Sequence, residues 1–215
     1  MSLPVLYYIH DPMCSWCWGF RPAWQQVEKA LTGKITIQYV LGGLAADNDF
    51  PMPVQMQARI KDTWLHIQKE IPGTEFNFDF WTQNKPRRST YPACRAIIAA
   101  GLQEQSTAGK NTKNLLFAIQ QAYYLDAKNP SDSEVLVQLS KDLGLDAKQF
   151  KVDLDSEKCE QLLQQELQLT NKLGASSFPS LVLNYNGSNT LISIDYNNSE
   201  TIISSILKNM KTSAG

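Results

Sequence analysis

Two cysteines lie three residues apart near the start of the chain, in the run Cys14-Ser15-Trp16-Cys17. The first thiol falls where a strand is predicted to give way to a helix, and free backbone N–H groups at the amino end of a helix stabilise a thiolate. The second thiol follows one helical turn later, close enough to close a disulfide and to resolve a mixed disulfide formed by the first. The spacing therefore predicts a redox pair in which Cys14 attacks and Cys17 resolves.

The same C-x-x-C spacing also occurs in zinc sites and between cysteines that are simply packed in a core. A zinc site needs two further ligands, whereas Cys94, Cys159, His10 and His66 are scattered singly rather than in a second pair. We therefore predict no metal site in this chain.

The other two cysteines need a separate interpretation. Cys94 comes shortly after Pro92, in what would be the first turn of a helix, a position that would lower its pKa and make it a third reactive thiol. It also lies on an apolar stripe at helical spacing, as does Cys159 with Leu162 and Leu163. Packing in a core is therefore the expected role of both thiols.

The elements around the redox pair follow from hydrophobic periodicity. The apolar run Val5 to Ile9 predicts a buried strand, and apolar residues at helical spacing from about Cys17 predict a helix that ends near Gly33. Polar and apolar residues then alternate from Lys34 to Leu41, which predicts a second strand reached by a β-α-β crossover. A C-x-x-C motif within such a unit is typical of thiol–disulfide chemistry.

Strand signals disappear from about residue 44 to residue 174, and helical signals accumulate there. The periodicity and the start signals predict helices over residues 53–70, 92–105, 135–143 and 156–173. Residues 131–134 fit a capping box ahead of the third of these helices, and Ser156 is placed to cap the fourth, which ends at Gly174. This part of the chain is therefore predicted to be a large all-helical insertion.

The last part of the chain returns to strands. Residues 178–183 and 190–194 predict two strands around Asn186-Gly187, a strong signal for a tight hairpin turn. A final helix follows, with its apolar face between Ile202 and Met210. The predicted fold class is therefore α/β, in the order β-α-β, helical insertion, β-β-α.

Composition and charge exclude several classes of protein. The 215 residues are 43% hydrophobic and 19% charged, unlike a disordered chain, a collagen-like fibre or a coiled coil. The 20 Lys and Arg residues nearly balance 21 Asp and Glu residues, so neither nucleic acid nor a membrane is an expected partner. The first ten residues resemble neither a signal peptide nor a membrane span. We therefore expect a cytoplasmic protein, in a compartment where accessible thiols are kept reduced.

Two segments together carry a family resemblance. The run Tyr8 to Phe20, with Ser177 to Leu181 near the other end, resembles the DsbA-type branch of the thioredoxin-like superfamily, and more narrowly its cytoplasmic FrnE-like group of protein-disulfide isomerases. That branch also carries a helical insertion between its β-α-β and β-β-α halves. The resemblance implies a thioredoxin-like fold in which residues 1–43 and 175–215 form one discontinuous domain and residues 44–174 form the helical insertion domain.

The resemblance also implies roles for individual residues. Cys14 would be the exposed nucleophile, Cys17 its partner, and Pro179 a cis-proline that faces them and frees backbone groups to pair with a substrate peptide. Trp16 lies between the cysteines and is expected to offer an apolar face to the substrate, with packing over the insertion as the alternative. The residues expected to contact the substrate are Ser15, Trp16, Phe178 and Pro179.

The implied activity is that of a thiol–disulfide oxidoreductase that reduces or isomerises disulfides of proteins or small molecules. It requires no cofactor, and glutathione is a candidate electron donor or ligand. The dipeptide Ser15-Trp16 replaces the Pro-His of periplasmic DsbA, so no imidazolium between the cysteines stabilises the thiolate further. We therefore expect a reduction potential near or below roughly −200 mV rather than toward roughly −120 mV, with the dithiol as the working form.

One alternative is a glutathione-dependent isomerase or transferase. Kappa-class glutathione transferases and hydroxychromene-carboxylate isomerases carry the same insertion and bind glutathione, but they generally have a serine at the position of Cys14. Within the predicted insertion, Lys85, Arg87 and Arg88 form a small basic loop that could hold a glutathione carboxylate. Such clusters are usually solvated surface. The presence of both Cys14 and Cys17 argues against this alternative without excluding bound glutathione.

A second alternative is a client-binding module or chaperone without catalysis, which would use the apolar surface around Trp16 and Trp18. His10 and Asp11 lie directly before the motif, where a titrating group could tune Cys14, but a lone histidine at a strand end is more often structural. Neither is assigned a catalytic role. The sequence predicts no oligomeric state.

Overall fold

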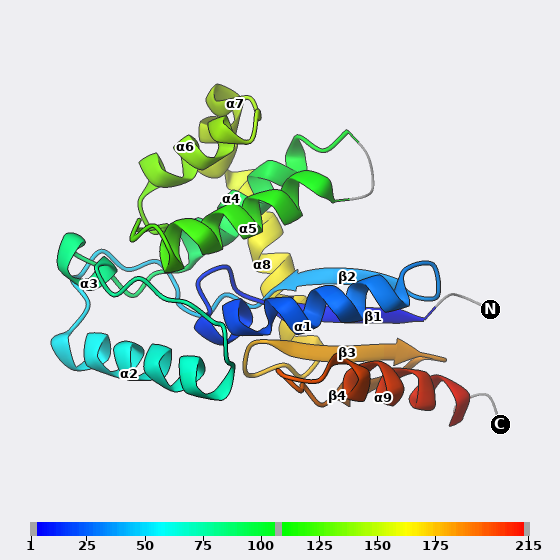
Figure 1. Ribbon diagram of the computed structural model, residues 1–215. Helices are drawn as coiled ribbons and strands as arrows, with labels where there is room; N and C mark the ends of the chain where they lie inside the picture. The colour runs from blue at the N-terminus through cyan, green and yellow to red at the C-terminus, as the bar shows by residue number, and fades with distance from the viewer. Residues whose placement is uncertain (1–3, 106–108, 213–215) are drawn as a thin grey trace.

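The computed structural model describes residues 4–105 and 109–212. Its centre is a four-stranded sheet in the order β2-β1-β3-β4, formed by β1 (Val5–His10), β2 (Thr36–Leu41), β3 (Ser180–Tyr185) and β4 (Ser188–Ile192). β1 runs parallel to β2 and antiparallel to β3, which pairs with β4 in an antiparallel hairpin. Helices α1 (Ser15–Leu31) and α9 (Ser199–Thr212) pack on one face of the sheet, and α8 (Glu157–Lys172) lies against the other (Figure 1).

The predicted β-α-β unit is confirmed. β1 and β2 pair in parallel from Val5 with Thr36 to His10 with Leu41. α1 begins at Ser15, two residues earlier than predicted, because the residue before it is already the N-cap. The apolar stripe that predicts the helix also fixes it on the sheet, since its members are buried in one cluster with strand residues; these members are Phe20, Trp24, Val27 and Leu31.

The hairpin turn is also confirmed. Asn186 and Gly187 have φ angles of +51° and +79°, the two left-handed conformations that a two-residue type I′ turn requires. β3 begins at Ser180, two residues later than predicted, directly after a cis peptide bond between Phe178 and Pro179. These two residues therefore lie in the loop that enters the sheet.

The chain between β2 and β3 is helical in the described residues. The observed helices at residues 54, 91, 133 and 157 start close to the predicted positions, whereas three others, α3, α5 and α7, lack a predicted counterpart. No helix in the described ranges is long and apolar enough to cross a membrane. The helices are α2 (Val54–Glu70), α3 (Phe80–Gln83), α4 (Tyr91–Leu102), α5 (Lys110–Tyr124), α6 (Ser133–Asp142), α7 (Ala147–Leu154) and α8.

One predicted helix cap is wrong and one is confirmed. Asp132 is the N-cap residue of α6, and its side chain makes no capping hydrogen bond. The hydroxyl of Ser131 instead donates to the Ser89 carbonyl (2.6 Å), because a buried hydroxyl needs a hydrogen-bond partner. This bond joins the start of α6 to the loop before α4. Ser156 does cap α8, since its Oγ accepts the N–H of Cys159 (3.1 Å).

An aromatic cluster forms the centre of the insertion next to the start of α1. The ring of Trp64, which is fully buried, lies 4.9 Å from that of Phe76, 5.1 Å from that of Trp81 and 5.7 Å from that of Tyr124, measured between centroids. The indole N–H of Trp64 donates to Ser15 Oγ (2.9 Å). The core of the insertion is therefore attached directly to the residue that follows Cys14.

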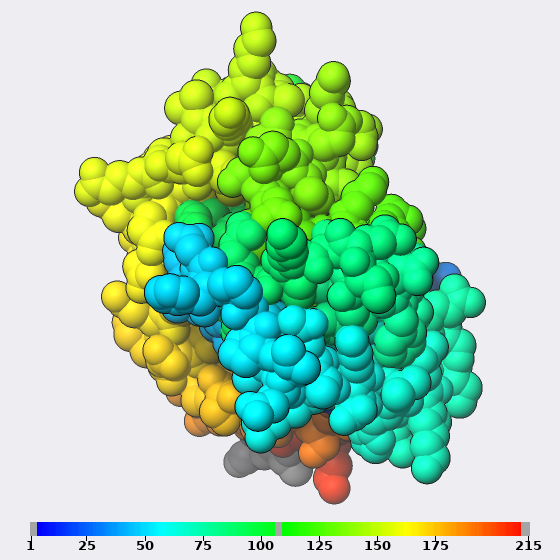
Figure 2. Space-filling model, turned by 90° about the vertical axis from the view of Figure 1, so that its left-hand side faces the viewer, coloured from blue at the N-terminus to red at the C-terminus, as the bar shows by residue number. Residues whose placement is uncertain are grey.

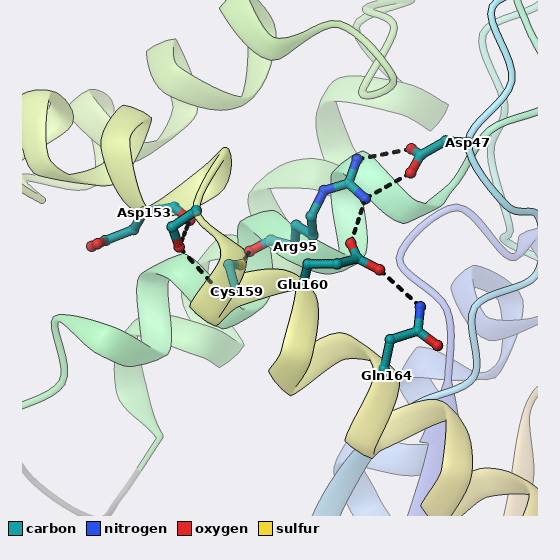
Figure 3. A network of polar contacts seen from close by, with 7 residues as sticks. Asp47, Arg95, Asp153, Cys159, Glu160 and Gln164 are labelled. Atoms are coloured by element: carbon teal, nitrogen blue, oxygen red, sulfur yellow. Dashed lines mark hydrogen bonds and ion pairs between the residues drawn. The ribbon is translucent and has the colours of Figure 1, made fainter.

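An ion network holds the segment after β2 against the insertion (Figure 3). The Arg95 guanidinium of α4 donates to both carboxylate oxygens of Asp47 (2.8 Å each) and to Glu160 of α8 (3.1 Å). The Asp47 contact is the main cause of the raised pKa of Arg95. A bidentate pair of this kind is stronger than a single surface ion pair, so residues 42–53 are held to α4 and α8.

Candidate redox site

Cys14 is the N-cap residue of α1 and has an extended backbone (φ −81°, ψ 114°). Its N–H donates to the Asp11 carbonyl (3.1 Å), and the N–H of Cys17 donates to its Sγ (3.4 Å). The sulfur thus accepts one of the N–H groups that have no partner within the helix, as a Ser or Asp oxygen does at other helix starts.

On its other side, the Cys14 thiol contacts the loop before β3. The thiol donates to the carbonyl of Phe178 (3.2 Å), the residue that precedes the cis peptide bond to Pro179. Gly42, at the end of β2, packs against the Phe178 ring so closely that a Cβ there would overlap it. Segments from both halves of the sheet therefore meet at the sulfur of Cys14.

Both thiols of the motif are buried, and Cys17 is the more deeply buried of the two. Cys14 is 4% exposed and Cys17 is 0% exposed, and both are free thiols. The expectation that Cys14 is exposed is therefore wrong, because the loop before β3 covers its sulfur. Burial raises the pKa of Cys17 well above its ordinary range, and the neighbouring Cys14 thiol raises it further. Cys17 is therefore a neutral thiol at neutral pH, and Cys14 is the sulfur that an incoming disulfide reaches first.

A buried carboxyl group, Asp11, lies behind the motif. Its Oδ1 accepts the N–H of Met13 (2.8 Å), and its Oδ2 accepts the N–H of Leu44 (2.7 Å), the hydroxyl of Thr90 (2.7 Å) and the thiol of Cys94 (3.6 Å). Burial raises its pKa, and the bonds from Leu44, Thr90 and Met13 offset part of this rise. Asp11 therefore joins the redox turn to the segment after β2 and to α4.

His10 is a structural residue of the sheet. Its side chain stacks on Tyr8 with ring centroids 5.1 Å apart, and its Nδ1 has no hydrogen-bond partner in the described structure. Burial lowers the pKa of His10 to about 3, so the ring is neutral at physiological pH. It supplies no positive charge to the motif.

Ser15 and Trp16 face the insertion. Ser15 accepts the Trp64 indole N–H described above, and the half-buried Trp16 ring lies 5.7 Å from His66 of α2 and 5.1 Å from Tyr196 in the segment between β4 and α9. Figure 2 shows residues 44–70, in light blue to cyan, at the surface of the side of the molecule where Figure 1 places α2. Trp16 therefore packs over the insertion while part of its ring stays exposed.

Three neighbours of the motif are absent from the sequence-based prediction. Trp64 and His66 come from a helix about fifty residues away in the chain, and Tyr196 comes from a loop near its end. None of them belongs to a motif with Cys14, so only an accurate tertiary arrangement could have identified them. The one available signal was the position of Tyr196 directly after a predicted hairpin.

The remaining cysteines are packed as expected. Cys94 and Cys159 are both 0% exposed. Burial and the facing Asp11 carboxyl raise the pKa of Cys94 well above its ordinary range, and burial raises that of Cys159 to about 12. The Cys159 thiol donates to the Arg95 carbonyl (3.2 Å). Among the described residues, no group of three or more His, Cys, Asp or Glu side chains could hold a metal ion.

The basic loop is only partly available to a ligand. Arg87 forms an ion pair with Asp132 (2.6 Å) and donates to the Ser131 carbonyl. Arg88 lines a small hollow together with Met13, the residue directly before Cys14. If a ligand carboxylate binds at this loop, Arg88 is therefore the side chain placed to meet it beside the redox turn.

Three known proteins show what this chain is similar to. The ClpXP adapter protein SpxH of Halalkalibacterium halodurans is 24% identical over 95% of this chain and 67% of its own length. A candidate protein disulfide isomerase from Nitrosomonas europaea has a solved structure that covers all of both chains, with a TM-score of 0.83 and 27% identity. The cytosolic disulfide reductase DsbM of Pseudomonas aeruginosa, also solved with GSH, covers 98% of both chains with a TM-score of 0.72 and 23% identity.

The chain spans 56% to 67% of the length of the curated SpxH relatives that it matches. The DsbM likeness, at 23% identity, shows the fold, and the observed sheet with its helical insertion agrees with it. The model of a thioredoxin family matches residues 7–205, which include both cysteines of the motif and the cis-proline loop. The chain therefore belongs to this thioredoxin family.

Proposed function

We propose that the protein is a thiol–disulfide oxidoreductase that reduces or isomerises disulfides through Cys14 and Cys17. The observation that carries the proposal is the position of Cys14 Sγ. It lies at the amino end of α1, between the N–H of Cys17 and the carbonyl of Phe178, with a second free thiol one turn behind it. This is the arrangement that a nucleophilic sulfur and its resolving partner require.

The reaction needs two exchange steps. The Cys14 thiolate attacks one sulfur of the substrate disulfide, forms a mixed disulfide and releases the other substrate sulfur as a thiolate. Cys17 then loses its proton and attacks Cys14 Sγ, which expels the second substrate sulfur. The two protons of the dithiol end on the substrate thiols, and its two electrons reduce the substrate while Cys14 and Cys17 form a disulfide.

The dithiol must then be regenerated, and we propose glutathione as the electron donor. Two glutathione molecules would reduce the Cys14–Cys17 disulfide and leave as oxidised glutathione, which balances the two electrons. DsbM, described as a cytosolic disulfide reductase and solved with GSH, supports this choice. Arg88, beside Met13, is the candidate partner for a glutathione carboxylate.

Trapping of the intermediate tests the proposal. Cys17→Ser leaves the nucleophile but removes the resolving thiol, so reaction with a disulfide-bonded peptide should accumulate a mixed disulfide on Cys14, detected by its mass. The Cys14→Ser variant should form none. Equilibration of the wild type with glutathione buffers should give a potential near or below roughly −200 mV. A failure of Cys17→Ser to form any mixed disulfide would overturn the proposal.

An adapter function is the second candidate. Phe50 and Val54, near the start of α2, are each 80% exposed, an unusual exposure for apolar side chains that suits contact with a protein partner. The curated relatives are named as ClpXP adapters, which supports this candidate. It predicts that a variant with both Cys14 and Cys17 replaced by serine still binds purified ClpXP, and that Phe50→Glu abolishes this binding.

A further inference from the structure

A hollow of about 430 Å³ lies on one side of the redox turn. Its walls come from the last turns of α2, from the segment between β4 and α9, and from Trp16, two residues after Cys14. Tyr196, which lines the hollow, is close enough to the two thiols that Cys17 and Cys14 help burial to raise its pKa. The hollow therefore lies beside the redox turn, with Trp16 as the residue that the two share.

Apart from the imidazole of His66, the ionisable side chains on the polar wall of this hollow are acidic. Glu70 and Asp195 both line it, neither forms an ion pair among the described residues, and the lining includes no Lys or Arg. Asp195 Oδ1 accepts the N–H groups of Asn197 (3.0 Å) and Asn198 (2.9 Å), which fixes this carboxylate at the rim. The carboxyl end of α2 adds partial negative charge to the same wall.

Aromatic rings form the side of the hollow nearest to the sulfur. Trp16 lies 5.1 Å from Tyr196 and 5.7 Å from His66, measured between ring centroids, and all three line the hollow. A cation that enters between the Trp16 and Tyr196 rings and the carboxylates is attracted by both, because the faces of these two rings carry negative partial charge. Anions are disfavoured at the same place.

We propose that this hollow binds a Lys or Arg side chain of the substrate polypeptide, close in sequence to the cysteine whose disulfide Cys14 attacks. The inference rests on the proposed oxidoreductase function and adds a substrate preference to it. Arg88 lines a separate hollow with Met13 and is absent from the lining of this one. The acidic lining would draw a basic substrate segment toward Trp16.

Single-turnover kinetics test this preference without an external electron donor. The reduced protein is mixed with disulfide-bonded peptides that are identical except for Lys, Ala or Glu two residues from the cysteine, and the second-order rate constant is measured by tryptophan fluorescence. We expect the Lys peptide to react about tenfold faster than the Glu peptide, as one partly desolvated cation contact would produce. The ratio should fall as salt is added.

The controls separate this inference from the function on which it rests. The double variant Glu70→Gln/Asp195→Asn should react equally with all three peptides, whereas Asp62→Asn, an exposed carboxylate elsewhere on α2, should keep the preference. Equal rates for the three peptides with the wild type would overturn the inference and leave the oxidoreductase function intact. No reaction with any peptide would overturn both. A preference that survives in the double variant would also overturn the inference.

Discussion

Cys14 and Cys94 are two thiols at the beginning of helices, and both contact Asp11. Cys14 is the N-cap of α1, and its backbone N–H donates to the Asp11 carbonyl. Cys94 is in the first turn of α4, and its thiol faces the Asp11 carboxyl. The two thiols nevertheless have different surroundings, because Cys14 keeps 4% of its surface exposed whereas Cys94 is fully buried, with a pKa well above its ordinary range.

The comparison shows that a helix start alone does not make a thiol reactive. Three residues of α4 precede Cys94, so its side chain is not at the N-cap position, where it could accept a free N–H group of the first turn. Cys14 does occupy the N-cap position of α1. Burial then decides against ionisation at Cys94, and the Asp11 carboxyl adds to that effect. The apolar residues at helical spacing around Cys94, which predicted a core position, are consistent with this burial.

The largest predicted effect is on turnover. Cys14→Ser should lower disulfide reduction on the order of 10³-fold or more, because the hydroxyl cannot form the mixed disulfide. Cys94→Ser keeps a donor for Asp11 and should change the rate by less than about twofold. Initial rates with a disulfide peptide check both values. Comparable losses in the two variants would show that Cys94 takes part in the reaction.

A pair of glycine substitutions compares the packing beside Cys14 with the packing of α4, the helix that carries Cys94. Gly42→Ala forces a Cβ into the Phe178 ring beside Cys14, and should cost about 1–3 kcal/mol of unfolding free energy and slow disulfide reduction. Gly101→Ala in α4 meets a Thr112 methyl group at 3.2 Å, and the higher helix propensity of alanine, up to about 1 kcal/mol, offsets this contact. Urea unfolding measures both, and equal stabilities would contradict the predicted tight fit at Phe178.

The redox turn and the sheet were predictable because their signals are local. The Cys14–Cys17 spacing, the stripe of α1 and the Asn186-Gly187 turn each depend on residues that lie close together in sequence. The surroundings of the turn were not predictable in the same way. Trp64, which donates to Ser15, is placed there by the packing of the whole insertion.

The sequence-based prediction missed α3, α5 and α7, each for a different reason. α5 follows Gly109, which has a left-handed backbone and makes no side-chain capping hydrogen bond, so its start lacks the Ser, Thr, Asp or Asn that marks a helix start most clearly. α3 is a single turn. α7 did carry a signal, because the Asp146 side chain accepts the N–H groups of Lys148 and Gln149 (3.0 Å each).

The pH dependence of stability tests the role of Asp11. Because burial raises its pKa above the ordinary value of 3.8, the folded state holds the proton more tightly than the unfolded chain does. The stability that comes from this proton is complete below the unfolded pKa and is lost as pH rises through the raised value. The free energy of unfolding should therefore contain a term that falls as pH increases above about 4.

Asp11→Asn removes this term because the amide stays neutral. The variant loses hydrogen bonds from Leu44 and Thr90 and should be about 1–3 kcal/mol less stable in acid, with a gap that narrows as pH rises. Urea unfolding from pH 4 to pH 8 measures the gap. A gap that widens with pH would mean that the hydrogen bonds to the carboxylate outweigh its burial.

The smallest predicted effect concerns the caps. Cys14 and Ser156 both accept the N–H of the residue three positions later, at 3.4 Å and 3.1 Å. Ser156→Ala should cost about 1 kcal/mol, the usual value of a lost N-cap, whereas Cys14→Ser should leave the reduced protein as stable as before or up to about 1 kcal/mol more stable. Urea unfolding under reducing conditions compares the two variants with the wild type. A loss of stability in Cys14→Ser would show that the sulfur is needed for packing. If there is no such loss, the sulfur contributes to this position through its reactivity and not through its capping hydrogen bond.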